Sequence, residues 1–325
     1  MSRNVFSVDG TRVTLNDREF KVIGLRVSNA IITDKTTRQL IDNLDVYRSY
    51  GVNTVSVFFM GSRFGDCKGY LRDASIDPAH AARMGRVIAE ADARDMVVIV
   101  GCLYWSNSRA KEDLVATWTE EHADRAVANT VRWLRDHEYR NVFVDVDNEG
   151  MAYRATGWSI ASMIDAAHDV DPSIMTAYND RDDPPAQADL YVHHSPKVDG
   201  RPWIQSEGTP NNARGGYWGA FSKEDGYYNY LRIGRYTDDM KREQIETTDR
   251  DIAEYNGHVL ASTWLQCPPH EGIGGPFMTP GGRADGPTVD EDVKALRGDE
   301  GVLWWLEHVR DRYGAWTGRQ LVADR

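Results

Sequence analysis

Two glutamates end short apolar segments of the chain and could work as a pair. Glu149 stands near the end of the segment NVFVDVDNEG over 141–150, and Glu207 near the end of RPWIQSEG over 201–208, with glycine directly after each glutamate. An apolar, β-rich run that stops in this way is typical of a buried strand that reaches the mouth of a barrel. Two carboxyl groups so placed can hydrolyse a glycosidic bond, one as proton donor and the other as nucleophile.

This chemistry needs the two carboxyl groups in different protonation states. We predict that Glu149 is the acid, because burial and a neighbouring carboxylate can raise its pKa towards neutrality. Glu207 must stay ionised to attack the anomeric carbon, so it needs a donor or a cation beside it, for which Tyr178, His193 and Arg26 are candidates. A separation of about 5 to 5.5 Å between the carboxyl groups would predict retention of configuration, and about 6.5 to 9.5 Å inversion.

The elements that must position these residues alternate between strands and helices. Most of the eight predicted strands are nearly continuously apolar, as strands covered on both faces must be. They are 20–25, 52–58, 96–103, 142–147, 174–177, 190–193, 203–206 and 259–264. Helical periodicity is found over 36–50, 78–94, 120–137, 157–169, 238–255 and 302–313. With no glycine-rich dinucleotide-binding motif, this pattern favours an α/β fold of the closed (β/α)8, or TIM, barrel type over a doubly wound sheet.

The start of the chain has a different pattern. Its first residues alternate apolar and polar around Asp9-Gly10 and Asn16-Asp17, which are hairpin turn signals. We therefore predict a short N-terminal β-hairpin over 1–19 that caps the barrel. A length of 325 residues with 41% hydrophobic content is sufficient for one large core, so a single catalytic domain over 1–325 is expected.

Functional groups of such barrels lie at the C-terminal ends of the strands. Amide, imidazole, guanidinium and aromatic side chains follow the predicted strands, and these types suit a sugar, because rings stack on pyranose faces and polar groups bind hydroxyls. We predict substrate-binding roles for Arg26, Trp105, Asn148, Tyr178, Asn179, His193 and Trp264. Asn148 would donate to the 2-hydroxyl, a hydrogen bond that strengthens as positive charge develops on the ring.

Charge and cysteine usage exclude several classes of protein. The chain has 50 acidic and 38 basic residues, a net charge of −12, which repels nucleic acid and anionic membrane surfaces. Its three cysteines are too few and too scattered for a disulfide framework or a common zinc site. His193 and His194 are adjacent on a predicted strand, so at most one of them enters the barrel. We predict neither a metal nor a cofactor.

No membrane-spanning or signal-like segment is recognisable in the sequence. We expect a cytoplasmic protein, or a secreted one if a signal peptide has been removed. Two long loops, 211–237 and 266–288, are expected to wall the pocket. The first is rich in aromatic residues and could equally form a dimer contact, so a monomer and a homodimer both remain open.

The chain resembles the large clan of retaining β-glycoside hydrolases built on a (β/α)8 barrel, which contains cellulases, mannanases and β-galactosidases. Asn148-Glu149 resembles the pair that ends their fourth strand, and RPWIQSEG resembles their seventh. STWL over 262–265 resembles their eighth strand, which implies that Trp264 lies under the sugar at the cleavage subsite. The resemblance implies a carbohydrate substrate, Glu149 as the acid/base and Glu207 as the nucleophile.

Three positions depart from the pattern of that clan. Gly150 stands where many members have proline, Ser56 where many have arginine, and Ser195 where a His-x-Tyr motif has tyrosine. We hypothesise that Arg26 replaces the missing arginine.

Structural alternatives remain at these positions. Glu149 could cap the following helix, Glu207 could be a solvated turn residue, and Trp264 could fill the core. The corresponding alternatives for function are a non-catalytic carbohydrate-binding barrel and a metal-dependent barrel hydrolase.

Overall fold

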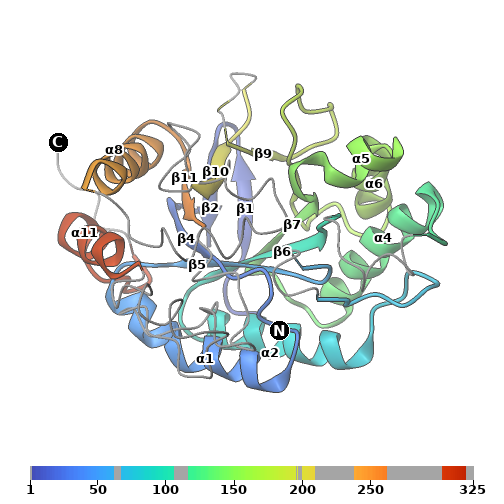
Figure 1. Ribbon diagram of the computed structural model, residues 1–325, viewed down its shortest axis with the longest axis horizontal. Coiled ribbons are helices and arrows are strands. Elements are labelled where there is room, and N and C mark those ends of the chain that lie inside the picture. Colours follow the sequence, from blue (N-terminus) through green and yellow to red (C-terminus); the bar gives the residue numbers. More distant parts are fainter. Residues whose placement is uncertain are drawn as a thin grey trace, which may run out of the picture.

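Eight parallel strands close into a barrel that is surrounded by helices (Figure 1). The computed structural model describes residues 2–61, 67–105, 116–194, 196, 200–208, 238–261 and 302–319. Around the barrel the strands follow the order β10-β11-β4-β5-β6-β7-β8-β9. Their bounds are β4 (Val22–Arg26), β5 (Thr54–Phe58), β6 (Val97–Leu103), β7 (Val142–Asp147), β8 (Thr176–Tyr178), β9 (Leu190–Val192), β10 (Trp203–Gly208) and β11 (Gly257–Leu260). Each overlaps a predicted strand, and the predicted (β/α)8 barrel is confirmed.

The described helices overlap the ranges predicted from helical periodicity, and one further helix, α5 (Met151–Thr156), is present. The described helices are α1 (Asp34–Ser49), α2 (Pro78–Asp92), α4 (Glu120–Asp136), α5 (Met151–Thr156), α6 (Ile160–His168), α8 (Asp238–Glu254) and α11 (Leu303–Tyr313). The predicted helix over 157–169 is shorter than expected, and the separate helix α5 precedes it. Gly157 divides the two, because its φ of +81° is left-handed and ends α5.

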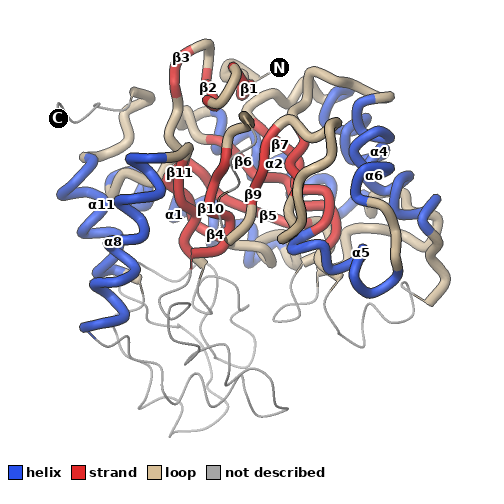
Figure 2. The backbone as a smooth tube through the Cα atoms, turned by 90° about the horizontal axis from the view of Figure 1, so that it is seen from above, coloured by secondary structure: helices blue, strands red, loops and turns tan. Residues whose placement is uncertain are grey.

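The N-terminal segment forms three antiparallel strands, one more than the predicted hairpin: β1 (Phe6–Asp9), β2 (Arg12–Leu15) and β3 (Arg18–Glu19). The second turn provides the third strand, since Asn16 and Asp17 both adopt positive φ, as tight hairpin turns require. The sheet packs against the N-terminal ends of the barrel strands, with Phe6 and Phe143 ring centroids 4.8 Å apart. It lies beyond one end of the barrel in Figure 2.

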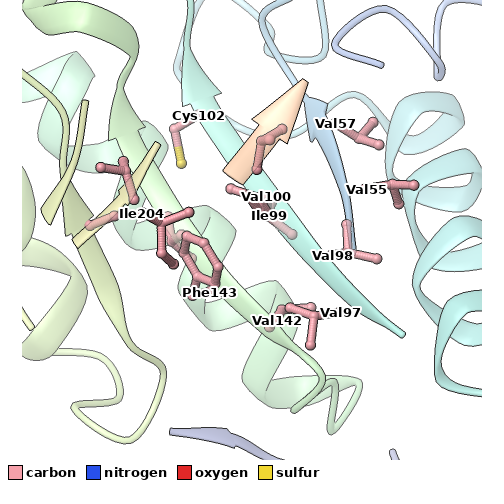
Figure 3. Close-up of a cluster of buried hydrophobic side chains, with 14 of the residues drawn as sticks. Val55, Val57, Val97, Val98, Ile99, Val100, Cys102, Val142, Phe143 and Ile204 are labelled. Atoms are coloured by element: carbon pink, nitrogen blue, oxygen red, sulfur yellow. The ribbon is translucent and has the colours of Figure 1, made fainter. Parts of the chain in front are cut away.

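The core explains why the strands read as continuous apolar runs. Val98, Ile99 and Val100 are successive residues of β6 whose side chains alternate between the barrel interior and the helix layer, and all three are buried. Figure 3 shows this cluster with its neighbours on β5, β7 and β10. Cys102 on the same strand is also completely buried, in agreement with a packing role.

In the described part of the chain, every helix is too short or too polar to cross a membrane.

Candidate active site

The two glutamates meet at the C-terminal end of the barrel. Glu149 is the second residue after β7, and Glu207 is the penultimate residue of β10. One carboxyl oxygen of each, together with a ring nitrogen of His194, lie within 4.8 Å of one another. The Glu149 side chain is 23% exposed, whereas that of Glu207 is 2% exposed. The Glu149 carboxyl group is thus partly accessible to solvent, whereas that of Glu207 is buried.

Arg26 is the cation beside Glu207. Its fully buried guanidinium lies 3.6 Å from Glu207 Oε2 and donates to the carbonyl of Ser206 at 3.2 Å. The rings of Phe58 and Tyr104 flank it, with their centroids 4.9 and 5.3 Å from Cζ. Arg26 ends β4 and pairs in register with Ser56 of β5, the position at which the clan that the sequence resembles often has arginine. A neighbouring strand therefore delivers a cation to this part of the barrel.

The amide of Asn148 has a defined orientation. Its Oδ1 accepts hydrogen bonds from Arg26 Nη2 and from Asn179 Nδ2, the latter at 3.3 Å. Asn179 Nδ2 also donates to Asp145 Oδ2 at 2.8 Å. Among the described residues nothing accepts from the buried Asn148 Nδ2, which is therefore left to donate to a ligand. Asn179, predicted to bind substrate, uses its amide nitrogen to hold Asn148 and Asp145.

Of the two adjacent histidines, His194 faces the carboxyl groups. Its Nε2 lies 3.7 Å from Glu149 Oε1. Burial lowers the pKa of His194, but the hydrogen bond and the charge of Glu149 outweigh burial and raise it. His193, the predicted site residue, packs its ring against Tyr191 and His194, and its carbonyl accepts from Trp203 Nε1 at 3.1 Å. Both histidines come after the last residue of β9, where the alternation of a regular strand no longer applies.

The tyrosine near the two glutamates is Tyr104, which follows β6, and not the predicted Tyr178 of β8. Tyr178 stacks on Tyr191, with centroids 6.1 Å apart, and no contact described for it involves Glu207. Tyr104, which follows β6, lies near Glu207 instead. Burial raises the pKa of Tyr104 well above its ordinary value, the charge of Glu207 raises it further, and Arg26 opposes both. Tyr104 comes directly after the predicted strand 96–103, the signal that marks a strand-end residue, but it is not among the residues predicted to bind substrate.

Two tryptophans were also predicted to bind substrate. Trp105 packs edge-on against Trp158 at 4.7 Å and lies 6.2 Å from Trp118, so it belongs to an aromatic cluster and is 9% exposed. Trp264 lies outside the described residues, as do Ser195 and the two long loops over 211–237 and 266–288.

The surroundings shift the pKa values of the two carboxyl groups in opposite directions. Burial raises the pKa of Glu207 to about 8, because the nearby Arg26 only partly compensates for lost hydration, and the hydrogen bond to Glu149 adds to the rise. Burial also opposes ionisation of Glu149, but hydrogen bonds from His194 and Glu207 outweigh it and lower the pKa of Glu149. Of the two carboxyl groups Glu207 therefore has the higher pKa, the reverse of the order expected for its role, because it is the more deeply buried.

The turn that carries Glu149 is left-handed at two successive residues. Glu149 has φ 52° and ψ 24°, and Gly150 has φ 58° and ψ 29°. Such a conformation costs a non-glycine residue roughly 1 to 3 kcal/mol. Asp147 caps α5 by accepting from the amides of Ala152 and Tyr153, both at 3.0 Å. The alternative that Glu149 is the helix cap is therefore wrong.

The structure also explains why glycine, and not the proline that is common in the clan the sequence resembles, stands at position 150. Proline fixes φ near −65°, which is incompatible with the positive φ of Gly150. A Cβ atom at Gly150 would lie 2.3 Å from Asp180 Oδ2. This departure is therefore a requirement of the local turn.

The same pair and His194 could in principle hold a metal ion. Glu149, His194 and Glu207 offer one carboxylate, one imidazole and a second carboxylate in close proximity. The guanidinium of Arg26, 3.6 Å from Glu207, and the raised pKa of Glu207 both oppose a divalent cation there. The residues present suit acid/base chemistry better than metal ligation.

The barrel is similar to those of several carbohydrate-active enzymes. No family model matches the sequence, and no curated protein matches it. A β-1,4-D-mannanase from Cryptopygus antarcticus has a TM-score of 0.51 at 12% identity, over 99% of both chains. The β-mannanase of the blue mussel Mytilus edulis has a TM-score of 0.54 at 12% identity, over 97% of this chain and 99% of the other. An exo-β-1,4-mannosidase from Opitutaceae bacterium strain TAV5 has a TM-score of 0.54 at 14% identity, over 90% of this chain and 60% of the other. At such identities the likeness shows a shared fold, the one that the sequence predicted.

Proposed function

We propose that this chain is a retaining glycoside hydrolase, a single catalytic domain that cleaves a β-glycosidic bond with Glu149 as acid/base and Glu207 as nucleophile. The observation that carries the proposal is the meeting of the two carboxyl groups at the C-terminal ends of β7 and β10, with oxygens within 4.8 Å. Retaining enzymes separate these groups by about 5 to 5.5 Å, whereas inverting enzymes leave room for a water at about 6.5 to 9.5 Å. The distance supports double displacement.

The first step requires a proton on Glu149, although burial gives Glu207 the higher pKa. When a sugar enters, Glu149 must hold the proton and Glu207 must be ionised, and the carboxyl oxygens lie within 4.8 Å, close enough for a transfer between them. Glu149 then protonates the glycosidic oxygen, the bond from that oxygen to the anomeric carbon breaks, and Glu207 bonds to the carbon. Arg26 stabilises the ionised Glu207 before the attack.

The second step releases the sugar. Glu149, now ionised, takes a proton from a water molecule, which attacks the anomeric carbon and displaces Glu207. The partial exposure of Glu149 suits this role, since water must reach it. Asn148 Nδ2 is oriented to donate to the 2-hydroxyl during both steps.

The substrate is a carbohydrate, either an oligosaccharide or a simple glycoside. Trp264, Trp105, Tyr178 and His193 remain predicted contacts for it, and His194 joins them because its ring lies beside Glu149. Since solved barrels of this shape include enzymes named for mannan and mannoside cleavage, manno-configured substrates should be tested first, followed by gluco- and galacto-configured ones.

Aryl β-glycosides and azide can test both roles in one series. Wild-type protein should release the phenol, and proton NMR of the first product should show the β-anomer. Azide should rescue Glu149→Ala to give the β-glycosyl azide, because Glu207 still forms the intermediate. Azide on Glu207→Ala should instead give the α-glycosyl azide. An α-anomer from the wild type, or full activity in either variant, would contradict the proposal.

The two alternative functions are separated by added measurements. A chelator should leave the wild-type rate unchanged, whereas loss of activity that Zn²⁺ or Mn²⁺ restores would favour a metal at Glu149, His194 and Glu207. Saccharide binding by calorimetry without turnover of any glycoside would favour the non-catalytic barrel.

A further inference from the structure

An ion pair with one buried partner lies beside the turn that carries Glu149. Arg154 of α5 donates through Nη1 to Asp180 Oδ1 at 2.9 Å and through Nη2 to the backbone carbonyl of Glu149. The Asp180 side chain is 1% exposed and that of Arg154 is 33% exposed. The described contacts of Arg154 in this site are with Asp180 and with the Glu149 backbone.

Asp180 is itself held firmly. Its Oδ1 also accepts from the amide of Arg181 at 2.7 Å, and its backbone carbonyl accepts from the hydroxyl of Tyr191 at 2.7 Å. Its carboxyl group fills the space beside Gly150 where a side chain would otherwise begin. The ion pair is thus anchored to β9 through Tyr191 and contacts both left-handed residues of the turn.

Without an external restraint, Glu149 would favour a right-handed or extended backbone. Rotation of the backbone there would swing the carboxyl group away from His194 and Glu207, since the side chain leaves the turn at its left-handed residue. The only hydrogen bond described for the Glu149 carbonyl comes from Arg154.

We propose that Arg154 and Asp180 are positioning residues, which hold the left-handed turn and thereby aim the Glu149 carboxyl group at the leaving-group oxygen. This inference rests on the proposed function. Neither residue touches the reacting atoms, and both act through the backbone of the acid/base.

If Arg154 and Asp180 position Glu149, their replacement should have an effect that depends on the leaving group of the substrate. Misplacing the acid impairs protonation of the leaving group and leaves the attack by Glu207 intact. Glycosides of strongly acidic phenols, such as 2,4-dinitrophenol, need little protonation, whereas alkyl glycosides and oligosaccharides depend on it fully. A misplaced Glu149 should therefore reduce kcat/KM for alkyl glycosides and oligosaccharides. It should leave the formation of the glycosyl-enzyme from 2,4-dinitrophenyl glycosides nearly unchanged.

The test compares kcat/KM of wild type, Arg154→Ala, Arg154→Lys and Asp180→Asn on a 2,4-dinitrophenyl and an alkyl glycoside of the same sugar. General acid catalysis contributes roughly 100- to 10,000-fold, so we expect Arg154→Ala to lose about 10- to 100-fold on the alkyl glycoside and less than about threefold on the activated one. Arg154→Lys should lie between, because an ammonium cannot serve both acceptors with a planar fork.

Arg140→Ala is the matched control. Arg140 is 30% exposed and forms a similar ion pair with Asp171 at 3.1 Å, but it precedes β7 at the opposite end of the strand. Its replacement should affect both substrates equally. If Arg154→Ala does not fold, as judged by circular dichroism and thermal melting, Arg154→Lys and Asp180→Asn decide the question.

Equal losses on both substrates in the Arg154 and Asp180 variants, with an active wild type, would overturn this inference alone. The same substrate dependence in Arg140→Ala would do so too. A wild type that turns over neither glycoside would overturn the proposed function, and this inference would fall with it.

Discussion

The buried guanidinium of Arg26 lies 3.6 Å from Glu207 Oε2 and also donates to the Asn148 side chain, so one cation contacts both the proposed nucleophile and the amide next to the acid/base. The first barrel strand supplies this cation, while β5 next to it offers only Ser56 at the paired position. The charge balance of the site therefore depends on contacts across the barrel.

Replacing Arg26 should impair the site through Glu207. In Arg26→Gln the carboxyl group of Glu207 would lose its nearest cation, its pKa would rise further, and the ionised nucleophile would become scarcer at neutral pH. We expect kcat/KM to fall by about 100- to 1,000-fold, the range found on removing one preorganised charge-stabilising group. The acidic limb of the pH profile of kcat/KM should move to higher pH. Undiminished activity would remove Arg26 from the site, and Arg26→Lys should retain more activity.

The stability of the protein should fall as the pH rises from about 4.5 to 8. The pKa of Glu207 is raised in the folded state to about 8, so the folded protein binds a proton in this range that the unfolded chain has released. Below about 4.5 both states are protonated and the contribution to the pH dependence vanishes. Asp147, with a pKa raised to about 7 by burial, acts in the same direction.

Glu207→Gln isolates the part that comes from Glu207. Its free energy of unfolding in urea should fall less between pH 5 and pH 8 than that of the wild type, by an amount on the order of a few kcal/mol. Parallel curves for the two proteins would contradict the assignment of the proton to Glu207.

The orientation of the Asn148 amide should depend on Asn179. Asn179→Ala removes one of the two donors to Asn148 Oδ1 and leaves Asp145 without its amide partner. A loss of about 1 to 2 kcal/mol of transition-state stabilisation is typical for one such hydrogen bond and corresponds to roughly 5- to 30-fold in kcat/KM. The loss should nearly disappear with a 2-deoxy glycoside, which lacks the hydroxyl to which Asn148 is proposed to donate. An equal loss on both sugars would indicate a general distortion of the barrel.

Alanine substitutions at two glycines can measure the steric contact between residue 150 and Asp180. Gly150 and Gly157 both have positive φ, but an added Cβ at Gly157 meets nothing within 4 Å, whereas at Gly150 it meets the carboxyl group of Asp180. Gly157→Ala should cost about 1 to 2 kcal/mol of unfolding free energy, the conformational penalty alone. Gly150→Ala should cost more and should also reduce activity. Equal losses of unfolding free energy in the two variants, measured in urea, would show that the Asp180 side chain moves aside without a penalty.

Sequence alone was sufficient for the architecture and for the main pair of residues. Continuous apolar runs separated by helical periodicity identify strands buried on both faces, and eight of them close a barrel. The position of Glu149 and Glu207 directly at the ends of two such runs then placed both at one mouth. These inferences succeed because they depend on local periodicity and on the direction of parallel strands.

Tertiary structure decided which neighbours complete the site and which carboxyl group has the higher pKa. His194 rather than His193, and Tyr104 rather than Tyr178, lie near the pair, because both histidines follow β9 and the two tyrosines end different strands. The backbone of Glu149 departs from the strand into a left-handed turn, which no alternation rule predicts. Side-chain direction beyond a strand end, and the depth at which each carboxyl group is buried, are set by contacts between segments far apart in the chain, so they could be read only from the folded barrel.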